Sequence, residues 1–412
     1  MSRAGNGLWL IRAVSTGVTH ENALRQDPLF FYLTGLENAV GAVLVLDAGR
    51  RETRLFVPVG GQLRGFLSSL QPPFAYVDAT GEFVKDAGII VAPWSEFEVF
   101  IDGRLKEDKT IVLRGPFRDK VPGLTAALVG QSESLLWEAA LRARWPNAQF
   151  AAAPDANALR SVKDADEIAT LRRVADMSAA ALRAAFGSVR AGRRQRESEA
   201  DVVKACTAAG ANGISFWPWI QSGPNSRITN AIQSLADYRY LDRVMQPGEL
   251  VRIDIGCDFD HYQGDVGRTA PVSGRFDAGQ REAWDLFVSA YRSGLAAMRP
   301  GVTSKDVFAI WQNVFRDRQK QLQSDFGRRT AAAALSSTAT QFWQIHGVGL
   351  DAAEGLVTTL QAGQAVAFEP MITVDQVGLY LEDMVFITSA GAEVLTADLP
   401  YTAAEIERAM RR

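Results

Sequence analysis

The chain has 412 residues, and its composition is that of a folded protein. Hydrophobic residues make up 47% and charged residues 22%, which excludes disorder along the whole chain. The formal charge is −3, from 44 basic and 47 acidic side chains, so a general binder of nucleic acid or of anionic membranes is not expected. At about 150 residues per domain, the length suggests two or three domains.

The cysteines and histidines are few. Two cysteines, Cys206 and Cys257, cannot build a disulfide framework or a multi-cysteine zinc site. The three histidines are His20, His261 and His346, so a metal site would draw most of its ligands from carboxylates. No apolar run approaches the roughly 18 residues of a membrane span, and the N-terminus lacks the features of a signal peptide. We therefore expect a cytoplasmic protein that binds neither nucleic acid nor membranes.

The first 150 residues alternate strand-like and helix-like segments, which is typical of an open α/β layer. The expected strands are 40–46, 54–58, 88–92 and 110–113. A helical pattern covers 124–144, and the small, proline-containing segment 151–155 is expected to be a linker. These features predict an α/β domain over residues 1–155.

The remainder, residues 158–412, is predicted to be an α+β domain. Apolar and small residues recur at three- and four-residue steps over 168–185, which predicts a long helix. Asp164 and Glu167 form a capping-box pattern at its start. Strands and hairpins are expected from about residue 250 onwards. Further helices are expected at 199–209, 279–298 and 304–323.

A turn, a strand and an acidic residue occur twice in this domain with the same spacing. Asp254 and Glu369 each lie six residues after the glycine of a Gln-Xaa-Gly turn. A second acid follows each of them: Asp265 comes eleven residues after the first, and Glu382 thirteen residues after the other. The simplest account is two β-hairpins, one in each half of a duplicated domain, each carrying two carboxylates.

Four carboxylates that converge in a partly dry site need counter-charge. Two divalent ions match that charge, with His346 as a fifth ligand, and carboxylates with one imidazole suit Mn²⁺, Fe²⁺, Co²⁺ or Zn²⁺. Two metals about 3.5–4 Å apart can activate a water and polarise a carbonyl, so a hydrolase is expected. Taken alone, each acid is better explained as a surface residue or helix cap, and His346 as a core histidine. Their paired positions on strands favour the metal site.

The same residues carry a resemblance to the pita-bread metallopeptidase family. The segments that resemble it are 254–256, 265–269, 346–350, 368–370 and 381–383. Within that family the likeness is greatest to aminopeptidase P and prolidase, which cleave bonds involving proline. The segment 25–35 resembles the N-terminal domain found in aminopeptidase P. The resemblance implies a duplicated α+β domain with a curved antiparallel sheet, preceded by a smaller α/β domain.

The resemblance also implies a role for each of the five residues. Asp254 would chelate one ion, and Asp265 and Glu382 would bridge two. His346 and Glu369 would hold the second ion, and Glu369 would also act as general base. The implied activity is hydrolysis of the peptide bond before proline in short peptides, as an aminopeptidase or dipeptidase. Manganese is the expected metal, and the family's habit is to form homodimers or larger homo-oligomers.

Three positions depart from the family pattern. Asn230 and Ala353 stand where the family usually has histidines that contact the substrate and stabilise the tetrahedral intermediate, so Asn230 is expected in the substrate site. Tyr380 replaces an arginine. His261 could substitute for a lost imidazole, although its neighbours Asp260 and Gly264 favour an exposed turn. Tyr262 lies where the family often has a tyrosine near the metals and is likewise expected in the substrate site, although a packed hairpin aromatic explains it equally well.

These departures leave two alternatives to an Xaa-Pro peptidase. A reshaped pocket would suit a different transition state, so one alternative is a pita-bread enzyme that acts on a small non-peptide substrate as a hydrolase or lyase. The other is a weakly active homologue that serves as a binding module. This one is less favoured, because binding modules have commonly lost metal ligands and all five ligand positions are filled.

Overall fold

The computed structural model describes residues 7–14, 26–37, 39, 41–58, 87–113, 133–152, 157–230, 242–336 and 343–411. The chain divides into two compact units, Met1–Leu159 and Arg160–Arg412, and each buries apolar side chains of its own. Among the helices in these ranges, none is long and apolar enough to cross a membrane.

The N-terminal unit is a six-stranded mixed sheet with helices on both faces. Its strands are β1 (Leu8–Arg12), β2 (Val43–Asp47), β3 (Glu52–Val57), β4 (Ile89–Pro93), β5 (Thr110–Leu113) and β6 (Gln149–Ala152), in the order β4-β3-β2-β1-β5-β6. Its helices are α1 (Pro28–Thr34), the 3₁₀ turn η2 (Trp94–Glu96), α4 (Phe97–Leu105) and α6 (Glu133–Arg144), and α7 (Asn157–Arg160) contains the boundary between the two units. Side chains alternate along β2: Val43 and Val45 pack with α4 and α6, whereas Leu44 packs with α1.

The α/β character predicted for this unit is confirmed, and its four predicted strands correspond to β2, β3, β4 and β5. Two strands were not predicted, β1 and β6. The linker prediction at 151–155 is wrong at its first two residues, which belong to β6 and pair in parallel with β5. Short alanine-rich segments carry no strand signal of their own, so the neighbouring backbone decides. Residues 153–155, like 124–132 of the predicted helix, lie outside the described residues.

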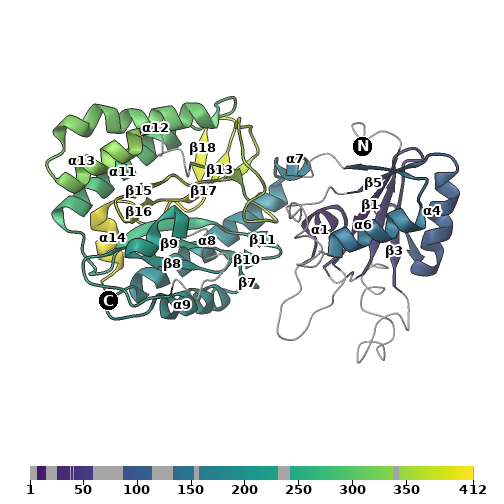
Figure 1. The fold of residues 1–412 in the computed structure, drawn as a ribbon, viewed down its shortest axis with the longest axis horizontal. Helices are drawn as coiled ribbons and strands as arrows, with labels where there is room; N and C mark the ends of the chain where they lie inside the picture. Colours follow the sequence, from purple (N-terminus) through teal and green to yellow (C-terminus); the bar gives the residue numbers. More distant parts are fainter. Residues whose placement is uncertain are drawn as a thin grey trace. The chain divides into compact units, whose positions relative to one another are not determined.

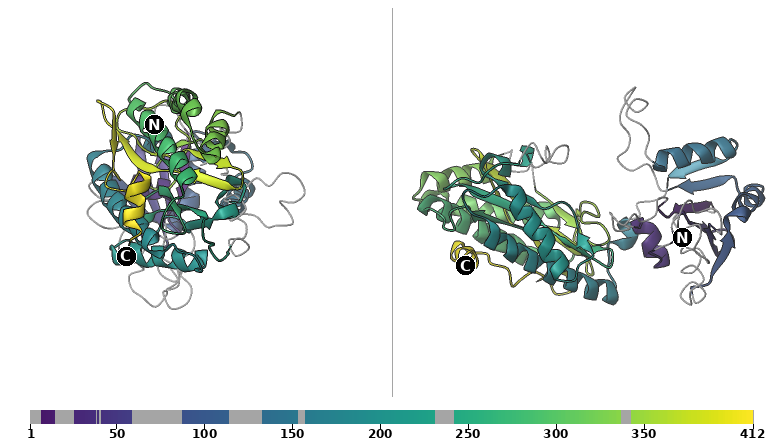
Figure 2. Two further views of the ribbon diagram at one scale, coloured as in Figure 1. Left: turned by 90° about the vertical axis from the view of Figure 1, so that its left-hand side faces the viewer. Right: turned by 90° about the horizontal axis from the view of Figure 1, so that it is seen from below.

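The C-terminal unit holds its strands between two groups of helices. Its helices are α8 (Ala165–Ser188), α9 (Gln195–Ala208), η3 (Gly223–Ser226), α11 (Ala278–Ala297), α12 (Ser304–Arg318), η4 (Gln319–Gln321), α13 (Asp325–Leu335) and α14 (Ala403–Ala409). Its first strands are β7 (Gly213–Ile214), β8 (Trp219–Ser222), β9 (Leu250–Ile255), β10 (Cys257–Phe259), β11 (Tyr262–Gln263) and β12 (Val266–Pro271). The later strands are β13 (Ile345–Gly347), β14 (Ala365–Phe368), β15 (Met371–Val374), β16 (Val377–Tyr380), β17 (Asp383–Ile387) and β18 (Ala392–Val394). Helices α8 and α9 cover the first strands, and the green helices α11 to α13 cover the later ones (Figure 1; Figure 2).

The predicted long helix is confirmed as α8, together with its capping box. The Asp164 side chain accepts hydrogen bonds from the backbone N–H groups of Asp166 and Glu167, and the Glu167 carboxylate accepts one from Asp164. The other predicted helices correspond to α9, α11 and α12 with shifted ends, and α12 continues as η4 beyond Arg318. Helix α13 was not predicted.

The two acid-bearing hairpins predicted from the repeated pattern are present. Strand β9 pairs antiparallel with β12 in the sheet β12-β9-β8, and β14 pairs antiparallel with β17 in the sheet β13-β14-β17-β18. The two halves join where Gly267 and Glu382 exchange backbone hydrogen bonds of 3.2 and 2.9 Å. Gly267 has no room for a side chain, because a Cβ atom there would lie 2.1 Å from the Tyr380 ring. This junction brings the acids of one half beside those of the other.

Cys206 of α9 and Cys257 of β10 form a disulfide, with their Cα atoms 5.4 Å apart. Both residues are fully buried. The bond ties α9 to the strand that follows Asp254 by three residues. Sequence reasoning did not anticipate it, because the two cysteines are 51 residues apart and only the tertiary fold brings them together.

Replacing both cysteines, Cys206→Ala with Cys257→Ala, is expected to lower the free energy of unfolding by about 4 kcal/mol, because the cross-link restricts the unfolded chain over a loop of about 50 residues. Chemical denaturation of wild type and variant in the same metal-free buffer measures the difference. Thiol titration of the unfolded, unreduced wild type provides the control. Detection of two free thiols there would contradict the disulfide.

Candidate metal centre

The five acidic and imidazole groups singled out by the sequence come from both halves of the C-terminal unit. Asp254 lies in β9, and Asp265 directly precedes β12. His346 lies in β13, Glu369 directly follows β14, and Glu382 lies between β16 and β17. All five residues are at most 7% exposed. Such burial of ionisable groups demands partners of opposite charge or hydrogen-bond donors.

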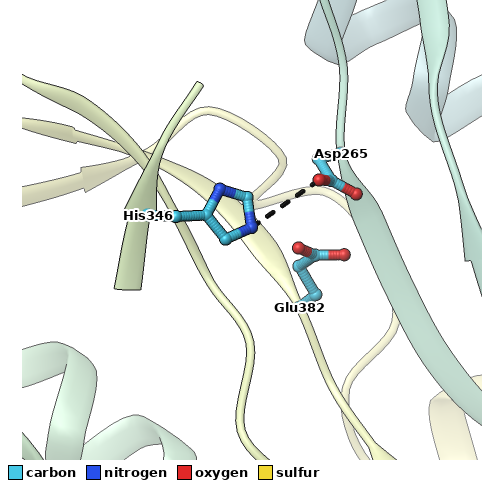
Figure 3. Close-up of side chains that lie close together, drawn as sticks. All are labelled: Asp265, His346 and Glu382. Carbon is cyan, nitrogen blue, oxygen red and sulfur yellow. Dashed lines mark ion pairs between the residues drawn. The ribbon is translucent and has the colours of Figure 1, made fainter. Parts of the chain in front are cut away.

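Four of these groups, those of Asp265, His346, Glu369 and Glu382, lie close together. Asp265, His346 and Glu382 each offer a ligand atom within 4.8 Å of the other two, and Figure 3 shows their side chains pointing toward a common centre. The His346 Nε2 atom lies 3.8 Å from Asp265 Oδ2 and 3.0 Å from Glu369 Oε1. The hydroxyl of Tyr380 lies 3.0 Å from Glu369 Oε2 and 2.7 Å from Glu382 Oε2. We refer to Asp254, Asp265, Glu369 and Glu382 as the acid cluster.

Asp254 joins the cluster from the neighbouring strand. Its Oδ2 atom accepts a hydrogen bond of 2.9 Å from Nη1 of Arg252, which is fully buried. The negative charge of Asp254 raises the pKa of both Asp265 and Glu382, as expected of close neighbours in a dry site. Asp254 is therefore near enough to Asp265 and Glu382 for its charge to act on both.

Burial and mutual repulsion raise the pKa values of three of these acids. At Asp254 desolvation is the largest cause, and the pKa rises to about 6 although the Arg252 cation lowers it. Burial and the charge of Asp254 raise the pKa of Asp265 well above its usual value, and burial and the charge of Asp265 do the same for Glu382. Carboxylates that resist ionisation without added positive charge are typical of a cation site.

The pKa of His346, which burial alone would lower, is also raised by the same negative charges. Burial disfavours its imidazolium form, but the hydrogen bond and charge of Glu369, with the charge of Asp265, outweigh this and raise its pKa to about 9. Its Nδ1 atom lies 3.1 Å from the carbonyl oxygen of Gly347, which can only accept, so Nδ1 carries a hydrogen. Once deprotonated, Nε2 is the atom that can bind a metal.

One oxygen of the cluster supports the fit to a metal. Oε1 of Glu382 is buried and, among the described residues, has no hydrogen-bond partner. A buried carboxylate oxygen without a donor is destabilising, and a cation would satisfy it. Carboxylate oxygens with a single imidazole nitrogen suit Mn²⁺, Fe²⁺, Co²⁺ or Zn²⁺. The residues present therefore fit divalent metal.

The residues proposed for substrate binding make other contacts. The Asn230 amide donates to the carbonyl of Pro224, 2.9 Å away and six residues earlier in η3. The Tyr262 hydroxyl donates to Glu167 of α8 at 3.1 Å, which fits the packed aromatic that the sequence also allowed. His261 lies in the β10–β11 turn with a positive φ of 66°. The expected roles of these side chains in substrate binding stay predictions.

Two residues that contact the acid cluster were not assigned to it from the sequence. Arg252 donates to Asp254, and Tyr380 lies against Glu369 and Glu382. Each stands two residues before an acid of the cluster, Asp254 and Glu382 respectively. Side chains two apart on a strand share a face, so this spacing is the signal that could have identified Arg252.

Comparison with known proteins places the chain in a family. The profile of "Metallopeptidase family M24" matches residues 169–389, just over half of the chain. The chain belongs to metallopeptidase family M24. The predicted membership of the pita-bread metallopeptidases is thereby confirmed.

This M24 chain is similar to peptidases of bacteria and archaea. It is 28% identical over 245 residues to "Xaa-Pro dipeptidase" of Pyrococcus furiosus, covering 58% of this chain and 64% of the relative. It is 27% identical over 275 residues to "Xaa-Pro aminopeptidase" of Escherichia coli, covering 62% of this chain and 61% of the relative. The match thus spans less than two thirds of the length of either relative.

Two solved structures are similar to the M24 chain over nearly its whole length. "Proline aminopeptidase P II" from Yersinia pestis aligns with a TM-score of 0.73 at 24% identity, covering 99% of this chain and 95% of that one. The aminopeptidase PepP of Pseudomonas aeruginosa aligns with a TM-score of 0.72 at 24% identity, covering 98% and 94%. At this identity the similarity shows the fold. The predicted pita-bread unit preceded by a smaller α/β unit is confirmed.

Proposed function

We propose that this chain is a dinuclear metal-dependent hydrolase that cleaves the peptide bond before proline, as an Xaa-Pro aminopeptidase or dipeptidase. The observation that carries the proposal is the convergence of Asp265, His346 and Glu382 within 4.8 Å. The names of the relatives support the substrate class, short peptides that contain proline.

In this proposal the acid cluster and His346 hold two divalent ions, Mn²⁺ being the expected metal. Asp254 would serve one ion, His346 and Glu369 would serve the other, and Asp265 and Glu382 would serve both. When bound, the ions would activate a water molecule and polarise the substrate carbonyl. A homodimer or larger homo-oligomer completes the proposal. The disulfide between Cys206 and Cys257 argues against the cytoplasmic location expected from the sequence, because such bonds are uncommon in the cytoplasm.

Glu369 is the proposed general base, which takes a proton from the attacking water. In the metal-free protein its Oε1 atom lies 3.0 Å from His346 Nε2, and its Oε2 atom lies 3.0 Å from the Tyr380 hydroxyl. The Tyr380 contact does not use a metal-binding atom of His346 and would orient the carboxylate in the metal-bound protein, and a positioned base is typically worth roughly 10²–10⁴-fold in rate.

The exchange Glu369→Gln is expected to lower kcat on an Xaa-Pro dipeptide and tripeptide by at least about 10²-fold, because glutamine cannot accept the proton. The measurement is steady-state hydrolysis by Mn²⁺-saturated protein, with metal content determined for each sample. Glu393→Gln, at an exposed carboxylate paired with Arg172, is the matched control and should keep full activity. Equal rates for Glu369→Gln and wild type would contradict the proposed base.

The replacement of two histidines by Asn230 and Ala353 specifically favours a second candidate. This is hydrolysis or lysis of a small non-peptide substrate by the same metal centre. Metal-loaded wild type that is inert on every Xaa-Pro peptide but turns over small esters or amides would support this candidate. If the protein binds metal but acts on neither class of substrate, the remaining alternative is a homologue that serves as a binding module.

A further inference from the structure

Arg252 is a buried arginine of β9 that lies directly beside the acid cluster. Arg252 and Asp254 share one face of β9, and their cross-strand partners on β8, Gln221 and Trp219, share it with them. The Arg252 guanidinium donates from Nη1 to Asp254 Oδ2 at 2.9 Å and from Nη2 to Gln221 Oε1 at 2.5 Å. Asp254 on β9 and Gln221 on β8 thus fix the orientation of the two Nη groups of the guanidinium.

Aromatic rings confine the same guanidinium. Its Cζ atom lies 4.8 Å from the centroid of the Trp219 ring and 5.3 Å from that of Tyr380. Contacts of this kind between a cation and a ring are strongest where water is excluded, and Arg252 and Tyr380 are both fully buried. The arginine therefore has little freedom to turn away from Asp254.

Tyr380 lies between Arg252 and the acids of the other half of the unit. Its backbone is held by Thr269, whose hydroxyl accepts from the Tyr380 N–H at 2.8 Å and donates to its carbonyl at 3.1 Å. Its hydroxyl lies 3.0 Å from Glu369 and 2.7 Å from Glu382. A phenol has one proton, so it donates to one of these carboxylates and keeps the other at hydrogen-bonding distance.

We propose that Arg252 and Tyr380 are positioning residues that hold the acid cluster in the geometry for two metal ions: Arg252 orients Asp254, and Tyr380 orients Glu369 and Glu382. The family pattern has an arginine at the position of Tyr380. In this chain Arg252, on β9, places a guanidinium beside the acid cluster instead. This inference rests on the proposed metal site. Residues that orient metal ligands in this way commonly contribute 10–100-fold to metal affinity.

The inference predicts an unequal effect on the two ions. Arg252→Gln removes the guanidinium donor that orients Asp254, so the ion served by Asp254 is expected to bind about 10–100-fold more weakly while the other dissociation constant changes little. Arg252→Lys keeps the charge without the fork and should recover part of the loss. Isothermal titration of metal-free protein with Mn²⁺ gives both dissociation constants, and the melting temperature of each metal-free variant reports its folding.

Tyr380→Phe tests the second residue with a smaller structural change. It removes only the hydroxyl, and we expect about 10-fold weaker Mn²⁺ binding. Tyr401→Phe is the matched control, because the Tyr401 hydroxyl donates at 2.7 Å to Asp383, which lies outside the acid cluster. The control variant should bind Mn²⁺ as wild type does.

The outcomes separate this inference from the proposed function. If wild type binds two Mn²⁺ ions, and Arg252→Gln and Tyr380→Phe bind them with unchanged affinity, the positioning roles are overturned while the metal site stands. Equal weakening of both ions by Arg252→Gln, with a lowered melting temperature, would show a structural role and also overturn the inference. Wild type that binds no Mn²⁺ would overturn the proposed function, and the inference with it.

Discussion

Mn²⁺ is expected to bind about 100-fold more weakly at pH 6 than at pH 8. A metal binds only the neutral imidazole and the ionised carboxylates, so protons compete with it. The pKa of His346 is raised to about 9 in the metal-free protein, so over this range the metal must displace its proton, at a cost of tenfold for each pH unit. The raised pKa values of Asp265 and Glu382 act in the same direction. Affinity should therefore rise with pH until it passes about 9.

Titration calorimetry at pH 6, 7 and 8, in buffers that differ in ionisation enthalpy, measures both the affinity and the number of protons released. At pH 7 we expect at least one proton to leave as the metal binds. His346→Gln is the informative variant, since it has no imidazole proton to displace and should show a flatter pH dependence. A wild-type dissociation constant that is the same at pH 6 and pH 8 would contradict this account of the cluster.

The acid cluster could be predicted because its members carry local signals. Asp254 and Glu369 each follow a turn and a strand, and burying an acid within an apolar strand has few explanations besides a cation. Convergence then follows from the duplication, since two similar hairpins place similar residues at similar positions. The pairing of Gly267 with Glu382, which joins the halves, has no local signal and emerges only in the structure.

What the sequence did not predict depends on contacts between distant segments. Arg252 stands two residues before Asp254, but its contact with the Tyr380 ring joins residues that are 128 positions apart. The same holds for the disulfide and for β6, whose alanines become a strand only beside β5. The Asn230 amide donates to the carbonyl of Pro224, and its expected contact with substrate stays a prediction.

The segment around Ala353 is rigidly held, which bears on the missing histidines. Glu354 pairs with Lys163 at 2.5 Å, and the backbone N–H of Ala352 donates to Gln263 at 3.1 Å. The backbone N–H of Glu354 also donates to the Gly347 carbonyl at 2.8 Å, next to His346. Ala353 itself is exposed between these anchors, so a larger side chain there meets no packed core.

The double variant Asn230→His with Ala353→His is therefore expected to raise kcat/KM on an Xaa-Pro peptide by about 10²-fold or more. Asparagine donates hydrogen bonds but carries no proton for transfer, and alanine does neither, whereas imidazoles supply both proton transfer and stabilisation of the oxyanion. Metal-saturated proteins must be compared, so that altered metal affinity is not mistaken for a change in chemistry. The matched control moves both histidines by one position, as Thr229→His with Ala352→His, and should gain nothing. A double variant that binds Mn²⁺ yet hydrolyses proline peptides no faster than wild type would show that another group already fills this role, or that the centre serves a non-peptide substrate.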